Sequence, residues 1–158
     1  MSCFVAGTFA KVPVMGNKIR LTDNWEFLRQ DVGNIWELVR PVKKGQPEEQ
    51  PIWTKVTLPH CFNAEDAVYP DLNYYQGPGW YKTRLKLDNP YPDGRVVLEF
   101  EGAGQKTDVY VYMTKVGSHV GGYDSWNVDI TDAVRTFLAS KDAERFGGEI
   151  PLSIRCDN

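Results

Sequence analysis

The sequence predicts an all-β protein, a jelly-roll β-sandwich with one short helix, and three observations lead to that fold class. Apolar side chains recur with a period of two in several separate runs, as they do in half-buried antiparallel strands. Turn-forming residues separate these runs, most clearly in the cluster NPYPDG at residues 89–94. Within each run apolar residues alternate with polar ones, whereas the strands of parallel sheets are continuously apolar.

Four runs carry the alternation, and each predicts one strand with an apolar inner face. The first two lie on either side of the 89–94 turn, the third follows the glycines of Gly102-Ala103-Gly104, and the fourth ends the chain. The predicted inward residues are Tyr81, Thr83, Leu85 and Leu87, then Val96, Leu98 and Phe100, then Val109, Val111 and Met113, and finally Ile150, Leu152, Ile154 and Cys156.

The stretch SHVGGYDSWNVDIT at residues 118–131 predicts a turn, a strand and the start of the helix. Its two glycines permit a tight backbone path at one end of the sandwich. Thr131 is expected to cap a helix over residues 132–138. The inward residues of the strand are then Trp126, Val128 and Ile130, and those of the helix are Val134, Phe137 and Leu138.

Composition argues against several classes of function. The 158 residues carry a formal net charge of −3, and the basic residues are scattered singly, so the sequence offers no basic surface for nucleic acid. Three cysteines far apart and two histidines match no zinc motif, and no cluster of Asp residues predicts a calcium site. We expect no metal and no cofactor. One disulfide is compatible with the three cysteines, but its pairing cannot be deduced.

The residues that most often catalyse reactions do not form a recognisable set. His60 and His119 are the only histidines, and His60 precedes Cys61 without a motif that would make them a catalytic pair. Structural roles are expected for both histidines. No phosphate-binding glycine motif is present, and most acidic residues fall on outward positions, so no carboxylate pair stands out. The chain by itself is therefore expected to lack a catalytic residue.

Aromatic residues next to Asp and Asn in the segment between Pro59 and Pro78 point to a different function. A sugar presents apolar C–H faces surrounded by hydroxyl groups, so its site needs an aromatic platform and polar side-chain partners. Long ordered loops are also uncommon unless they have a function. The alternative is that the rings only fill the ends of the sandwich. The candidate carbohydrate-binding residues are Asp71, Asn73, Tyr74, Tyr75 and Trp80.

The first sixteen residues are expected to be an extension of a domain that occupies residues 17–158. Their apolar character is compatible with the remnant of a secretory signal, which would place the protein in the periplasm or outside the cell. It is equally compatible with an extended segment of a cytoplasmic protein. The segment is too short to span a bilayer.

Five ordered motifs together resemble the N-terminal sugar-binding domain of glycoside hydrolase family 2, of the β-galactosidase and β-glucuronidase type. The similarity extends from about Asn17 to the last residue. The motifs are WTKVTLPHCFN (53–63), YYQGPGWYKTRLKL (74–87), VVLEFEGAGQKTDVYV (96–111), VGSHVGGYDSWNVDIT (116–131) and LSIRCDN (152–158).

The resemblance implies a galactose-binding-domain-like sandwich that precedes an immunoglobulin-like domain and a TIM barrel. In this family two glutamates of the barrel are catalytic, so the sandwich would only position a β-galactoside or β-glucuronide substrate. The resemblance implies a parent enzyme most similar to the β-galactosidase group. In β-galactosidase-type members an Asn of the loop before the Gly-Trp-Tyr strand reaches the sugar. Asn73 is the matching candidate here and Asp71 is the second.

Some features depart from the family pattern, and other functions stay open. Residues 112–115 replace a usual Asn-Gly hairpin, so a different turn is expected. The chain stops where members continue to a closing strand, and residues 4–12 are one candidate to pair at the edge that this strand would cover.

The alternative functions are a free-standing carbohydrate-binding module, with Tyr74, Tyr75 and Trp80 as its platform, and a structural sandwich for protein contacts.

Overall fold

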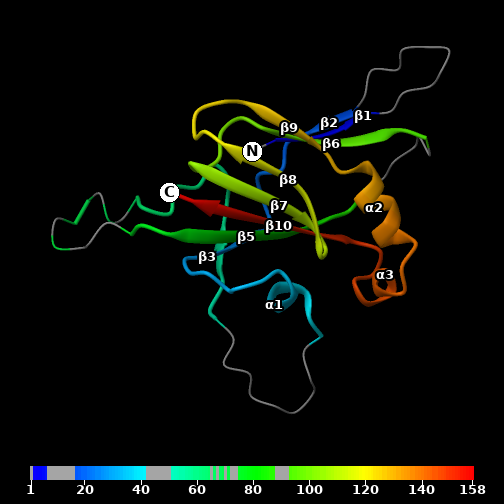
Figure 1. Ribbon diagram of the computed structural model, residues 1–158, viewed down its shortest axis with the longest axis horizontal. Coiled ribbons are helices and arrows are strands. Elements are labelled where there is room, and N and C mark those ends of the chain that lie inside the picture. Colours follow the sequence, from blue (N-terminus) through cyan, green and yellow to red (C-terminus); the bar gives the residue numbers. More distant parts are fainter. Residues whose placement is uncertain are drawn as a thin grey trace.

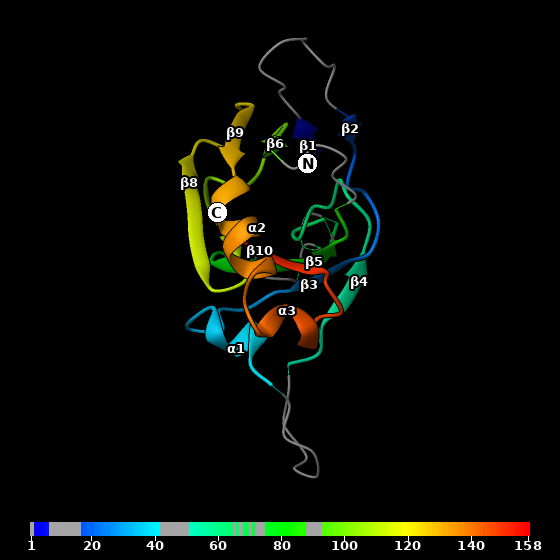
Figure 2. The same ribbon diagram turned by 90° about the vertical axis from the view of Figure 1, so that its right-hand side faces the viewer.

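The computed structural model describes residues 2–6, 17–41, 51–64, 66, 68, 69, 71, 75–87 and 93–158, with only the backbone described for residues 2–6 and 17. Within these residues two antiparallel sheets are stacked face to face, as Figures 1 and 2 show. The predicted all-β sandwich is therefore confirmed. None of the helices in the described part of the chain is long and apolar enough to cross a membrane.

The smaller sheet has the strand order β2-β1-β6-β9 and the larger has the order β4-β3-β5-β10-β7-β8. Helix α2 packs against both sheets at one end of the sandwich, whereas α1 and α3 lie beyond the larger sheet in Figure 2. The bounds are β1 Ser2–Ala6, β2 Asn17–Ile19, β3 Trp25–Leu28, α1 Trp36–Val39, β4 Thr54–Val56, β5 Pro78–Leu85, β6 Arg95–Phe100, β7 Lys106–Val111, β8 Thr114–Val120, β9 Trp126–Asp129, α2 Thr131–Leu138, α3 Asp142–Arg145 and β10 Ile150–Asp157.

The core lies between the two sheets, and most of the residues predicted to face inward line it. Alternate residues of β6 and β10 are almost completely buried, as the period-two pattern requires. Pro151 and Ser153 of β10 are buried as well, although they alternate with the inward residues. The predicted inward residues with at most 6% exposure are Tyr81, Leu85, Val96, Leu98, Phe100, Val109, Val111, Val128, Ile130, Val134, Phe137, Ile150, Leu152, Ile154 and Cys156.

Two of the predicted inward residues are exposed, and each lies at or just beyond the end of a regular element. Strand β7 ends at Val111, and Tyr112 has a φ of 52°, so Met113 lies in the turn and is 46% exposed. Tyr112, in this left-handed conformation, forms the turn that stands in place of the Asn-Gly hairpin, as the sequence required. Leu138 is the last residue of α2 and is 45% exposed, so the prediction that it faces the core is wrong.

The predicted N-cap of α2 is wrong by one residue, because Ile130 occupies the N-cap position and its side chain makes no capping hydrogen bond. Thr131 is the first residue of the helix, and its backbone N–H donates to Oδ1 of Asp129 (3.0 Å). The Thr131 hydroxyl donates to the same carboxylate oxygen (2.6 Å) and accepts a hydrogen bond from the backbone N–H of Val96 (2.8 Å). Asp129 therefore satisfies the helix terminus, and Thr131 connects the helix to β6.

Strand β1 pairs antiparallel with β6, from Ser2 opposite Glu99 to Ala6 opposite Arg95. Residues 4–6 of the segment expected to pair at an open sheet edge thus pair with β6, while residues 7–12 lie outside the described residues. That this is the edge of the closing strand stays a prediction. Strand β5 lies between β3 and β10, and its pairing with β10 runs from Pro78 opposite Asp157 to Leu85 opposite Ile150. This register sets which residues meet at each end of the larger sheet.

Candidate functional site

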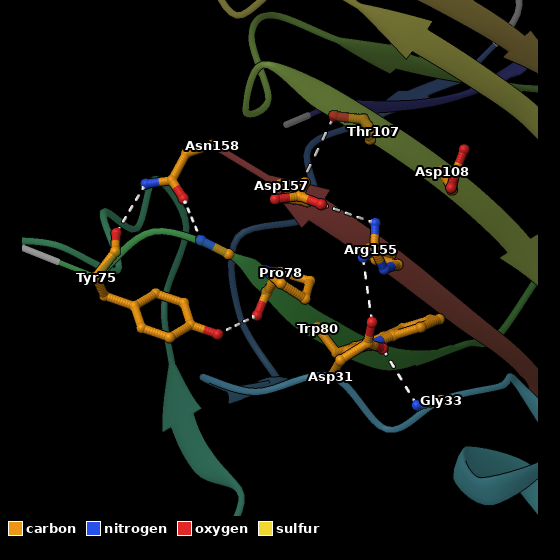
Figure 3. Close-up of polar contacts among 12 residues, drawn as sticks. Asp31, Gly33, Tyr75, Pro78, Trp80, Thr107, Asp108, Arg155, Asp157 and Asn158 are labelled. Atoms are coloured by element: carbon orange, nitrogen blue, oxygen red, sulfur yellow. Dashed lines mark hydrogen bonds and ion pairs between the residues drawn. The ribbon is translucent and has the colours of Figure 1, made fainter.

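The start of β5 and the end of β10 bring the candidate loop next to the last residue of the chain. Because Pro78 pairs with Asp157, Gly77 and Asn158 are neighbours just beyond the ladder. The Asn158 side chain accepts a hydrogen bond from the backbone N–H of Gly77 (3.2 Å) and donates one to the carbonyl oxygen of Tyr75 (3.3 Å), as Figure 3 shows. The side-chain amide of Asn158 thus extends the pairing of the two strands toward the loop.

Tyr75 is held by both of its backbone polar groups and by its hydroxyl group. Its N–H donates to the Asp66 carboxylate (3.0 Å), and its carbonyl oxygen also accepts from Asn63 Nδ2 (3.1 Å). Its hydroxyl donates to the carbonyl oxygen of Pro78 (2.9 Å). The ring lies alongside the residues that follow it, where Gly77 adopts a φ of 143° and a Cβ would approach the Tyr75 hydroxyl oxygen to 3.2 Å.

Arg29, which follows β3, completes this group of contacts. Its guanidinium donates to the Asp66 carboxylate and to Oδ1 of Asn63 (3.3 Å), and it lies 4.8 Å from the centre of the Tyr75 ring. The hydrogen bond from the Tyr75 N–H and the neighbouring Arg29 hold the pKa of Asp66 below its usual value, so this buried carboxyl is ionised at neutral pH. The four side chains around Tyr75 form what we call the Tyr75 clamp: Arg29, Asn63, Asp66 and Asn158.

A second polar network lies on the outer face of the larger sheet. Asp31 accepts hydrogen bonds from the indole N–H of Trp80 (3.2 Å), from Arg155 (3.2 Å) and from the backbone N–H of Gly33 (3.2 Å). Arg155 also pairs with Asp157 at 3.2 Å. The hydrogen bonds from Trp80, Gly33 and Arg155 outweigh desolvation and lower the pKa of Asp31. These contacts hold the segment around Asp31, which follows β3, against the Trp80 side chain.

A cleft of about 470 Å³ opens beside the Tyr75 clamp. His60 and Tyr81 form a hydrogen-bonded pair on its wall, with 2.9 Å between His60 Nδ1 and the Tyr81 hydroxyl. Burial lowers the pKa of His60 and raises that of Tyr81, so both are neutral at pH 7. The lining residues are Leu58, Pro59, His60, Cys61, Phe62, Asn63, Tyr81, Gly102, Ala103, Gly104, Gln105, Gly122, Tyr123, Cys156 and Asn158.

The two histidines have structural partners, in line with the expectation for both. The His119 ring stacks on Trp126 with 4.8 Å between centroids, and Trp126 stacks on Phe100 at 4.2 Å. No group of three or more His, Cys, Asp or Glu side chains in the described ranges is arranged to hold a metal ion. Cys61 and Cys156 are free thiols, the first exposed and the second buried.

The structure places the predicted carbohydrate-binding residues in different surroundings. Asp71 is exposed, Tyr75 is partly buried within the clamp, and Asn73 and Tyr74 lie outside the described residues. Trp80 is only 2% exposed, packs against Tyr110 with 5.6 Å between centroids, and donates its indole N–H to Asp31. Its position therefore gives no support to the prediction that it is a stacking platform for a sugar.

Sequence reasoning did not find the clamp residues. Asn63 and Asn158 are the last residues of two of the motifs that carried the family resemblance, so these motifs contained a signal for them. Arg29 and Asp66 lie in no such motif, and their partnership depends on the fold.

The comparison with family models matches residues 21–139 to the description "Glycosyl hydrolases family 2, sugar binding domain". The chain belongs to this family. A family 2 relative, the putative β-glucuronidase of Formosa agariphila, is 28% identical over 89% of this chain, which corresponds to 15% of that protein. The chain thus spans less than a fifth of the length of this relative, and it matches the N-terminal domain.

Two solved structures of family 2 β-glucuronidases share the fold of this chain closely. The β-glucuronidase of Parabacteroides merdae is 75% identical with a TM-score of 0.85, over 90% of this chain and 18% of that protein. The β-glucuronidase 3 of Bacteroides uniformis is 65% identical with a TM-score of 0.85, over the same shares. The family 2 resemblance predicted from the five motifs is therefore confirmed.

Proposed function

We propose that this chain is the substrate-positioning domain of a family 2 β-glycosidase, and that the parent enzyme is a β-glucuronidase. The observation that supports this most strongly is the 75% identity with a β-glucuronidase over 90% of the chain. In this proposal the catalytic barrel and an immunoglobulin-like domain are further parts of the same polypeptide. The sandwich contributes binding contacts, whereas bond cleavage takes place in the barrel.

The end of the sandwich near Tyr75 is the part proposed to face the sugar. The loop between Asp66 and Tyr75 carries Asp71, whose side chain is exposed, and Asn73, the candidate for a hydrogen bond to a sugar hydroxyl. A carboxylate and a carboxamide supply the acceptors and donors that hydroxyl groups require. A contact made by a rigidly held loop positions the substrate without taking part in the chemistry.

The test is made on the complete product of the gene that encodes this chain. We expect this protein to hydrolyse p-nitrophenyl β-glucuronide, and we expect Asn73→Ala to lower kcat/KM by about tenfold, as loss of one substrate hydrogen bond does. Preference for p-nitrophenyl β-galactoside would contradict the assignment to glucuronides. Unchanged kinetics in both Asn73→Ala and Asp71→Ala would contradict the assignment of this loop.

A free-standing carbohydrate-binding module is the second candidate function, and the cleft of about 470 Å³ beside the clamp favours it because its volume suits a small ligand. Calorimetric titration of the 158-residue chain with glucuronic acid, galactose and short oligosaccharides separates the two candidates. Tight binding by the isolated chain supports the module, and lack of binding together with activity of the complete protein supports the positioning domain.

A further inference from the structure

The contacts around Tyr75 close a loop at its base. Asp66 and Tyr75 stand at the two ends of the segment 67–74, and the Asp66 carboxylate accepts the Tyr75 N–H directly at 3.0 Å. The Tyr75 carbonyl oxygen accepts two side-chain N–H groups, from Asn63 (3.1 Å) and from Asn158 (3.3 Å). Both backbone polar groups of Tyr75 are therefore bound by side chains, which fixes the orientation of its peptide planes.

The clamp connects the loop to the rigid part of the sandwich. Arg29 follows β3 and Asn158 follows β10, so two strands of the larger sheet each supply one side chain. Strand β5 enters the sheet at Pro78, which has no N–H group to continue the ladder, and Asn158 bonds the N–H of Gly77 instead. The position of Tyr75 is thus set by β3, β5 and β10 together.

The charges within the clamp are matched. Asp66 has a side chain that is only 4% exposed, and a buried carboxylate requires compensation. Arg29 supplies the opposite charge, and the Tyr75 N–H supplies a further donor to the same oxygen atom. Replacing Asp66 by Asn keeps the size of the side chain but places an amide against a guanidinium, which removes the ionic part of the contact.

We propose that the Tyr75 clamp is a positioning device for the substrate loop, and that Asp66 and Arg29 are positioning residues of the parent enzyme. This inference rests on the proposed function, because a fixed loop base matters for activity only if the loop meets the sugar. The clamp residues act through Tyr75 and the loop, not by contact with the reacting atoms. Their loss releases the Tyr75 backbone from its partners, which weakens substrate binding and leaves the cleavage chemistry in place.

The first experiment measures the clamp without any sugar. Hydrogen exchange of the Tyr75 amide is compared in the complete gene product and its Asp66→Asn variant, with the Ile154 amide of strand β10 as the reference for folding of the sandwich. We expect exchange at Tyr75 to become about tenfold faster and exchange at Ile154 to stay unchanged. Equal exchange at Tyr75 in both proteins would overturn the proposal.

The second experiment measures the effect on catalysis in the complete gene product. We expect Asp66→Asn to raise KM about tenfold with kcat changed less than twofold, and we expect Arg29→Lys, which keeps the charge opposite Asp66, to raise KM less. Glu149→Gln is the matched control, because Glu149 pairs with Arg84 at 3.9 Å at the opposite end of β5. Faster exchange at Tyr75 with unchanged KM in Asp66→Asn would overturn the positioning role.

These outcomes separate failure of the inference from failure of the proposed function. If Asn73→Ala and Asp71→Ala leave the kinetics unchanged, the loop does not meet the sugar, whatever the exchange at Tyr75 shows. If those variants lose activity while Asp66→Asn does not, the loop meets the sugar but the clamp does not position it. A variant that fails to fold is recognised by fast exchange at Ile154, and Arg29→Met then replaces it in both experiments.

Discussion

The two ends of the sandwich are stabilised by different kinds of contact. At the end where α2 and α3 lie, the rings of Phe137 and Phe146 pack against Tyr112 with centroid distances of 5.1–5.8 Å. At the opposite end, the Tyr75 clamp binds backbone groups through carboxamide and carboxylate side chains. Ring packing is weakly directional and contributes free energy of folding, whereas hydrogen bonds to a single peptide fix its position. Stability and positioning are thus divided between the two ends of the sandwich.

The largest effect on stability is expected from a substitution at the end of the sandwich where α2 and α3 lie. Phe137 is 3% exposed, so Phe137→Ala should lower the free energy of unfolding by about 3–5 kcal/mol, through lost burial and the cavity left behind. Urea denaturation followed by circular dichroism measures the change. Leu138→Ala, at a neighbouring position that is 45% exposed, is the control and should cost less than about 1 kcal/mol. Equal losses in the two variants would contradict the assignment of this stability to the buried ring of Phe137.

A smaller effect is expected from the network that covers Trp80. Asp31→Ala removes the acceptor of the Trp80 indole N–H and a partner of Arg155, and should lower the free energy of unfolding by about 1 kcal/mol, because Asp31 is partly exposed. The emission of Trp80 should also move to longer wavelength as the covering segment loosens. An Asp31→Asn variant keeps an acceptor for the indole and should retain most of the stability.

The smallest and most local effect is expected from acid. The folded pKa of Asp66 lies below the usual value of 3.8, so the clamp gains stability from this carboxylate above that pH and loses it as the pH falls through the folded pKa. The protection factor of the Tyr75 amide should therefore be constant above about pH 4 and fall below it, before that of Ile154. Equal loss at both amides would show that the clamp end does not open separately.

The sandwich could be predicted from the sequence because its core follows a local pattern. The burial of Val96, Leu98 and Phe100 depends only on alternation along one strand. The errors at Met113 and Leu138 occurred where an element ends. Met113 lies two residues beyond the end of β7, whereas Leu138 is the last residue of α2 and is exposed there.

The candidate site could be predicted only in part. Tyr75 was found from its composition and surroundings, but its partners come from segments that meet only after folding, such as Arg29 and Asn158. Trp80 alternates with the inward Tyr81, so the sequence places it on the outer face. Its burial follows from the segment around Asp31, which covers that face through a long-range contact. Burial of this kind depends on tertiary packing, which the alternation of residues along one strand does not encode.

Strand β8 has a consequence for how the protein behaves at high concentration. It pairs only with β7 and ends the larger sheet, so among the described strands it exposes a row of backbone groups to solvent. An open strand edge of this kind can recruit a strand from another molecule. The pairing of β7 with β8 contains a register shift between Val109 and Tyr110, and Lys115 places a positive charge on β8. Both features discourage a second chain from aligning there, and they protect the protein against aggregation through this edge.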